Sequence, residues 1–161
     1  MSETNELRKS FMKRAVELAR YAVENNLGGP FGAVVVKNGI IIGEGYNCVT
    51  STNDPTAHAE IVAIRNACRR LGGFQLQGCE IYSSCEPCPM CLGAIYWARP
   101  STVYYGTTRH DAATAGFDDS FIYDELEITG EKRKIPAICL YDPDAVNIFG
   151  TWIVKEDKIN Y

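Results

Sequence analysis

The stretch FGAVVVKNGIIIGEGYN, residues 31–47, holds two apolar runs joined by Lys37-Asn38-Gly39. Asn-Gly between runs rich in β-branched residues is the strongest short signal for a β-hairpin, because both residues tolerate the positive φ angles of a tight turn. We therefore expect two antiparallel strands here, and the rest of the fold is built around them.

Helical and strand patterns alternate on both sides of this hairpin. Apolar residues recur at helical spacing from Leu7 to Ala22, and a second helical stripe runs through residues 59–73. Strand-like runs at residues 79–84 and 102–107 flank a short helix that Pro89 opens and Pro100 ends. This alternation predicts an α/β fold with a mixed sheet and helices on both faces.

The C-terminal third is less regular. Residues 107–134 show no clear period, and so long an irregular segment usually covers a site or reaches a partner. Residues 135–141, IPAICLY, have a strand pattern, and residues 142–161 predict a helix that ends at Tyr161.

Size and composition place the chain among single-domain globular proteins. It has 161 residues, 46% hydrophobic and 22% charged, so we expect one domain over residues 1–161. No apolar run reaches membrane-spanning length, and the N-terminus lacks the order of a secretory signal, which favours the cytoplasm. A net charge of −4 favours a small-molecule substrate over nucleic acid.

Seven cysteines, an odd number, favour metal binding or catalysis over disulfides. Residues 83–91, SSCEPCPMC, carry three of them at three-residue steps. An iron-sulfur run would need a fourth cysteine at position 95, which is isoleucine, and the other cysteines form no second C-x2-C knuckle. A four-thiolate structural site is therefore disfavoured, whereas a catalytic zinc needs three protein ligands only.

The histidines complete the ligand set. Of the two, His58 lies two residues before Glu60 at the start of a predicted helix, whereas His110 lies among polar residues and is expected to be solvated. Cys88 and Cys91 begin the next helix on one face, so the expected zinc ligands are His58, Cys88 and Cys91. Cys85 precedes the helix and is expected to be a buried thiol.

His58-Ala59-Glu60 followed by Pro87-Cys88-Pro89-Met90-Cys91 forms the H-x-E and P-C-x-x-C pattern of zinc nucleobase deaminases. Longer matching stretches are residues 28–39, 53–60, 84–100 and 111–123, the last of which reads DAATAGFDDSFIY. On these residues the chain resembles the cytidine-deaminase-like superfamily and, within it, the small bacterial guanine deaminases. The first two motifs belong to the whole superfamily, whereas AGFDDSFIY and a C-terminal Tyr are more specific.

The resemblance implies a cytidine-deaminase-like three-layer α/β/α sandwich around a five-stranded mixed sheet, with one Zn2+ per chain. It also implies a homodimer in which a C-terminal segment, about residues 142–161, is exchanged between chains. The departures from the family pattern lie mainly between Glu125 and Phe149.

Carried over by position, the resemblance makes Glu60 the proton shuttle beside the zinc. It also implies a substrate pocket formed by Asn47, Phe31, Trp97, Asp119 and Tyr161. Of these, Asp119 and Tyr161 are expected to take part in catalysis as well as binding. Tyr161 is expected to come from the partner chain.

The expected reaction is zinc-dependent hydrolysis of guanine to xanthine and ammonia. Alternatives are deamination of guanosine, of cytosine or of an adenosine in tRNA, or a zinc-binding module without activity. A tRNA enzyme should cluster Lys and Arg near its end, whereas TWIVKEDKIN, residues 151–160, mixes both signs of charge.

Overall fold

The computed structural model describes residues 3–161, so the first two residues of the expected domain lie outside it. The chain forms two compact units, one ending at Asp119 and one running from Ser120 to Tyr161. The first unit holds the sheet and the helices that surround it.

A four-stranded sheet of order β2-β1-β3-β4 forms the centre of the first unit. Its strands are β1 (Gly32–Lys37), β2 (Ile40–Tyr46), β3 (Cys79–Cys85) and β4 (Thr102–Thr107). β1 is antiparallel to both β2 and β3, and β3 is parallel to β4, so the sheet is mixed as predicted. The predicted hairpin is confirmed, and Asn38 and Gly39 take φ angles of 51° and 75°, as its tight turn requires.

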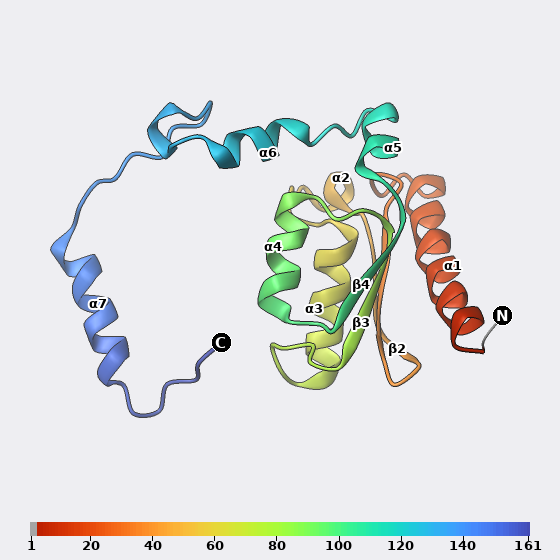
Figure 1. Cartoon of the computed structure of the whole chain (residues 1–161), viewed down its shortest axis with the longest axis horizontal. Helices are drawn as coiled ribbons and strands as arrows, with labels where there is room; N and C mark the ends of the chain where they lie inside the picture. Colours follow the sequence, from red (N-terminus) through yellow and green to blue (C-terminus); the bar gives the residue numbers. More distant parts are fainter. Residues whose placement is uncertain (1–2) are drawn as a thin grey trace. The chain divides into compact units, whose positions relative to one another are not determined.

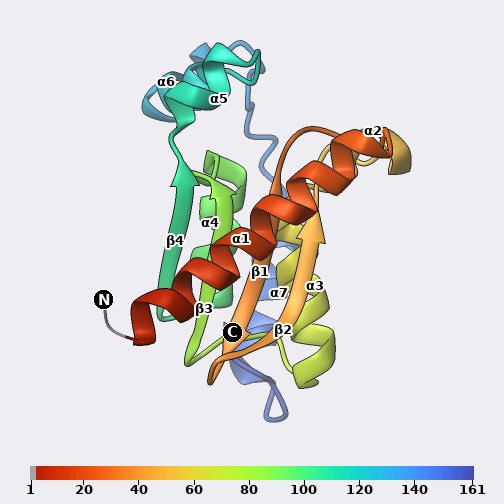
Figure 2. The ribbon, with the colours of Figure 1, turned by 90° about the vertical axis from the view of Figure 1, so that its right-hand side faces the viewer.

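Helices cover both faces of this sheet (Figures 1 and 2). α1 (Glu3–Glu24) packs Phe11 and Leu18 on the face that carries Val34 and Tyr82. The other face carries Ala33, Val35 and Ile81, and against it lie α3 (Ala59–Leu71) and α4 (Pro89–Ala98). Successive residues of β1 thus point to opposite layers, which is the period of two that a strand imposes.

α3 lies unusually close to β2, because small residues meet at their contact. A Cβ atom on Gly45 would lie 2.2 Å from the carbonyl oxygen of Ala59, and one on Gly43 would lie 2.5 Å from that of Ala63. Only glycine allows this approach. The contact fixes the first turn of α3, where His58 and Glu60 lie.

In the first unit, two short helices were not expected from the sequence. α2 (Val49–Thr52) lies between β2 and α3, and α5 (Arg109–Thr114) follows β4. Thr108 caps α5 through a reciprocal pair of hydrogen bonds with Asp111. Segments this short carry too few turns to show a periodic pattern.

The second unit contains α6 (Ser120–Glu127), the 3-10 helix η1 (Gly130–Lys132) and α7 (Pro143–Val154). The strand predicted at residues 135–141 is wrong, and so is the five-stranded sheet, since the described chain has four strands. A strand is stable only beside another strand, and Ile135, Ile138 and Leu140 are exposed.

α7 confirms a helix in the tail, although with a different end. Asp142 caps its N-terminus by accepting a hydrogen bond from the Asp144 N–H. The helix ends at Val154 rather than Tyr161, because Lys155 takes an extended conformation and the Lys158 side chain donates to the Ile153 carbonyl. No helix within residues 3–161 is long and apolar enough to cross a membrane.

Candidate metal centre

Two helix N-termini supply the predicted zinc ligands. His58 is the N-cap residue of α3, and Cys88 is the N-cap residue of α4. Pro89 begins α4, where its missing N–H and fixed φ suit the first turn, and Cys91 follows within that turn. Both helix N-termini carry partial positive charge, which stabilises thiolates placed there.

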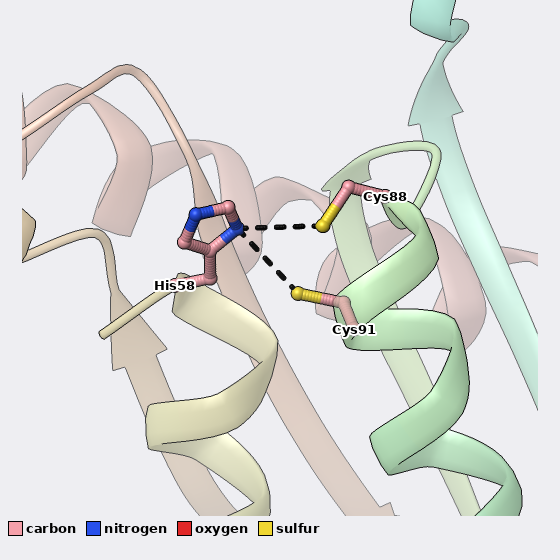
Figure 3. Close-up of side chains that lie close together, drawn as sticks. All are labelled: His58, Cys88 and Cys91. Carbon is pink, nitrogen blue, oxygen red and sulfur yellow. Dashed lines mark hydrogen bonds between the residues drawn. The ribbon is translucent and has the colours of Figure 1, made fainter. Parts of the chain in front are cut away.

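The side chains of His58, Cys88 and Cys91 converge between α3 and α4 (Figure 3). The Nδ1 atom of His58 lies 3.6 Å from the Sγ atom of Cys88 and 3.6 Å from that of Cys91. All three donor atoms lie within 4.8 Å of one another, and this is the one group of potential ligands found in the part of the chain that the structure describes.

These distances suit zinc. A tetrahedral zinc with a nitrogen at about 2.0–2.1 Å and a sulfur at about 2.3 Å holds the two donors about 3.6 Å apart. One imidazole and two thiolates are also ligands that zinc prefers among the biological metals. The residues present therefore fit this ion with three protein ligands, the number typical of a catalytic site.

Protonation differs between the two cysteines. Hydrogen bonds from the Cys91 thiol and from His58 lower the pKa of Cys88 to about 4. The hydrogen bond between the two sulfurs, together with burial, raises the pKa of Cys91. The hydrogen bond between His58 and Cys88 raises the pKa of His58. Because a cysteine must be a thiolate to bind a metal, binding would release the proton that the two sulfurs share.

Glu60 lies beside this group and is 6% exposed. Its Oε1 atom accepts a hydrogen bond of 3.0 Å from the hydroxyl of Ser83, and its Oε2 atom lies 3.4 Å from the Sγ atom of Cys91. Burial raises the pKa of the Glu60 carboxyl above its usual value. A carboxyl group of this kind is suited to both accepting and returning a proton.

Cys85 was expected to be a buried thiol and His110 to be solvated, and both expectations are confirmed. The thiol of Cys85 is buried and donates to the Thr108 carbonyl at 3.5 Å, so it lies outside the ligand group. His110 is exposed on α5. Sequence reasoning missed Glu86, whose carboxylate accepts the Arg109 N–H at 3.0 Å and ties the start of α5 to the end of β3.

Asn47 and Phe31 lie together where β1 begins and β2 ends. The backbone N–H of Asn47 donates to the Phe31 carbonyl at 2.9 Å, and its Oδ1 atom accepts from the backbone N–H groups of Gly29 and Val49. These bonds orient the amide and leave its NH2 group to donate. The backbone of Cys48 bonds to that of Ala57 at 3.1 Å, which ties this corner to the residue before His58.

The remaining predicted pocket residues differ in position. Burial and the charge of Cys88 raise the pKa of the Asp119 carboxyl above its usual value. Trp97 is 64% exposed on α4, and Tyr161 is 69% exposed in the second unit. Their roles in a substrate pocket stay predictions.

The fold and this site define a zinc deaminase domain. The chain belongs to the family described as "Cytidine and deoxycytidylate deaminase zinc-binding region", which matches residues 5–107. That zinc-binding region and the single His/Cys/Cys group within residues 3–161 agree on one Zn2+ per chain.

Some individual relatives match more of the chain than this family model does. The chain is 57% identical over 153 residues to the guanine deaminase of Bacillus subtilis (strain 168). The aligned region covers 95% of this chain and 98% of the relative. The X-ray structure of guanine deaminase from Bacillus subtilis matches with a TM-score of 0.93 and 53% identity, over 100% of this chain and 99% of that chain. A tRNA-specific adenosine deaminase of Aquifex aeolicus is 45% identical over 95 residues, 59% of this chain and 62% of the relative.

Proposed function

We propose that this protein hydrolyses guanine to xanthine and ammonia, with zinc held by His58, Cys88 and Cys91. The observation that carries the proposal is the convergence of these three side chains beside the buried carboxyl of Glu60. The choice of guanine is supported by the similarity to a guanine deaminase over 95% of the chain.

Glu60 has the central chemical role in this proposal. His58, Cys88 and Cys91 would hold zinc with three side chains, and the ion would supply an open position for water and lower the pKa of that water toward ~7. Glu60 accepts a proton from the attacking water and delivers protons to a ring nitrogen and to the departing amino group. The bond from C2 of guanine to its amino nitrogen breaks as a C–O bond forms, so guanine and water give xanthine and ammonia.

Substrate recognition is assigned to groups around the metal centre. The NH2 group of Asn47 is free to donate to a purine acceptor, because backbone N–H groups already hold its Oδ1 atom. Phe31 packs edge-on against Phe117, with ring centroids 5.0 Å apart, and offers an apolar wall. Asp119 is proposed to accept from the ring N–H groups of guanine, and Trp97 to form a second wall.

A homodimer is proposed to complete this pocket. β4 is an edge strand with no strand on its outer side among the described residues, and edges of this kind readily pair with another chain. Beside it, α4 and β4 line a groove of about 390 Å3 that includes the exposed Leu92 and Tyr96. We propose that the C-terminal segment of a second copy, about residues 142–161, covers this side and brings Tyr161 to the pocket. Residues 1–161 would then form one deaminase domain.

The cytoplasm is the proposed location, because a site built on two cysteine sulfurs works only while they stay reduced. All seven cysteines in the described chain are free thiols.

The competing functions predict different products. A tRNA deaminase is less well supported, because the tRNA-specific adenosine deaminases are 45% identical over 59% of this chain or 38% identical over 78% of it, against 57% over 95% for the guanine deaminase. Guanosine and cytosine deaminases would share the zinc chemistry, and a binding module would release no ammonia. Incubating the zinc-loaded protein with guanine, guanosine, cytosine, adenine and tRNA, and identifying the products by chromatography, separates these cases. Xanthine from guanine at the highest rate supports the proposal, and a higher rate on any other substrate contradicts it.

A further inference from the structure

Two adjacent serines are buried in the middle of the sheet. Ser83 and Ser84 are 1% and 7% exposed, on a strand that lies between β1 and β4. A buried hydroxyl is unfavourable unless it is hydrogen-bonded. Neighbouring residues on a strand point to opposite faces, so these two hydroxyls serve different layers of the molecule.

Ser84 has a structural partner. Its Oγ atom accepts the backbone N–H of Gly32 at 3.0 Å and so helps join β3 to the start of β1. Tyr82, two residues earlier on the same face, packs in the cluster beneath α1. Ser84 therefore points away from the metal centre.

Ser83 shares the opposite face with Ile81, which packs in the core beneath α3 and α4. Its hydroxyl donates to the Oε1 atom of Glu60 at 3.0 Å. The other carboxylate oxygen, Oε2, lies 3.4 Å from the Sγ atom of Cys91. The two carboxylate oxygens of Glu60 thus have different neighbours. Oε1 is hydrogen-bonded to Ser83 of the sheet, and Oε2 faces the ligand group.

We propose that Ser83 is a positioning residue that fixes the rotation of the Glu60 carboxylate, so that Oε2 faces the metal centre. The inference rests on the proposed function, in which Glu60 moves the proton. The last torsion of a glutamate side chain is broad and roughly two-fold, so a hydrogen-bond partner is needed to select one orientation of the carboxylate plane. Proton transfer needs the accepting oxygen within hydrogen-bond reach of the donor, and small displacements lower the rate strongly.

The test compares Ser83→Ala with Ser84→Ala, since each removes one buried hydroxyl from neighbouring positions on β3. Ser83→Ala is expected to lower kcat by about 10- to 100-fold, with KM for guanine within about twofold of wild type and one zinc retained per chain. Ser84→Ala is expected to keep kcat within about twofold, although it loses a backbone contact. Ser83→Thr, which restores the hydroxyl on a strand that favours β-branched residues, is expected to recover most of the lost kcat.

Several results would overturn the inference. One is equal kcat for Ser83→Ala and Ser84→Ala, and another is loss of zinc or a matching rise in KM in Ser83→Ala, which would indicate a general structural role. The inference would also be overturned if Ser83→Thr folded and bound one zinc per chain but did not recover the lost kcat.

The wild-type enzyme separates this inference from the proposed function. If it deaminates a base other than guanine, the choice of guanine fails, and Ser83 is judged by the same comparison on that base. If it releases ammonia from no base, both proposals fail together.

Discussion

Replacing Glu60 by Gln separates a catalytic carboxyl from a structural one. Glutamine has the same shape and can still accept the hydrogen bond of 3.0 Å from Ser83, but it cannot take up and return a proton. General acid–base catalysis contributes about 10²- to 10⁴-fold, so kcat should fall by this factor, which is about 2.7–5.4 kcal/mol of transition-state free energy. Zinc content should stay at one per chain, since the three donor groups are unchanged.

Stability should respond in the opposite direction to activity. Burial raises the pKa of Glu60, which means that the fold disfavours its charged form. A neutral glutamine removes this penalty, so the zinc-free variant should unfold at the same urea concentration as wild type or a higher one. Urea unfolding followed by circular dichroism, beside steady-state xanthine production, measures both quantities.

Glu44 is the matched control, because it is a carboxylate on β2 with the opposite behaviour. Arg14 holds it with bonds of 2.7 and 2.9 Å and lowers its pKa. Glu44→Gln should keep kcat within about twofold and lose about 0.2–1 kcal/mol of stability, the range for solvent-screened pairs. A lowered pKa stabilises the fold fully above the unfolded value of about 4.3, and this stabilisation is lost as the pH falls through the lowered pKa of Glu44. The difference in stability between Glu44→Gln and wild type should therefore vanish at that low pH. A Glu60→Gln enzyme that keeps full kcat, or one that unfolds more easily than Glu44→Gln, would refute the reasoning.

Three further experiments test other parts of the site and the assembly. Cys91→Ser should reduce zinc well below one per chain in elemental analysis, whereas Cys85→Ser should retain it, because the Cys85 thiol bonds to Thr108 instead; equal zinc in both variants would contradict the ligand assignment. Gly28→Ala should raise KM for guanine and lower stability by about 1–3 kcal/mol, because its Cβ would lie 2.3 Å from the Oδ1 atom of Asn47; an unchanged KM would argue against Asn47 as a substrate contact. Light scattering should give about twice the 17.8 kDa of one chain, and a monomer mass would contradict the proposed dimer.

Patterns in the sequence predicted those elements whose causes are local. Asn38-Gly39 set the hairpin, Pro89 and Pro100 bounded α4, and the 102–107 run became β4 with the predicted ends. Each depends on turn chemistry, proline or short-range alternation, which neighbouring residues determine.

The errors concern features that depend on distant contacts. The apolar run 135–141 has the composition of a strand, but pairing decides whether a strand forms, and this segment has no strand partner in the described chain. α2 has four residues, too few for a period.

In the candidate site, too, the sequence predicted residues with local signals and missed a contact between distant residues. The spacing of His58, Cys88 and Cys91 identified the ligand group, since each begins or nearly begins a helix whose N-terminus the sequence marks. Ser83 was missed because its contact with Glu60 joins residues 23 positions apart. A pair of serines in the strand CEIYSSC was the one available signal, because a buried hydroxyl needs a partner.

X-ray absorption spectroscopy on the zinc-loaded protein tests the central claim most directly. The account predicts one zinc per chain, with one nitrogen at about 2.0–2.1 Å, two sulfurs at about 2.3 Å and one further light atom from solvent. A coordination sphere of four protein ligands, or a protein that binds no zinc, would contradict it.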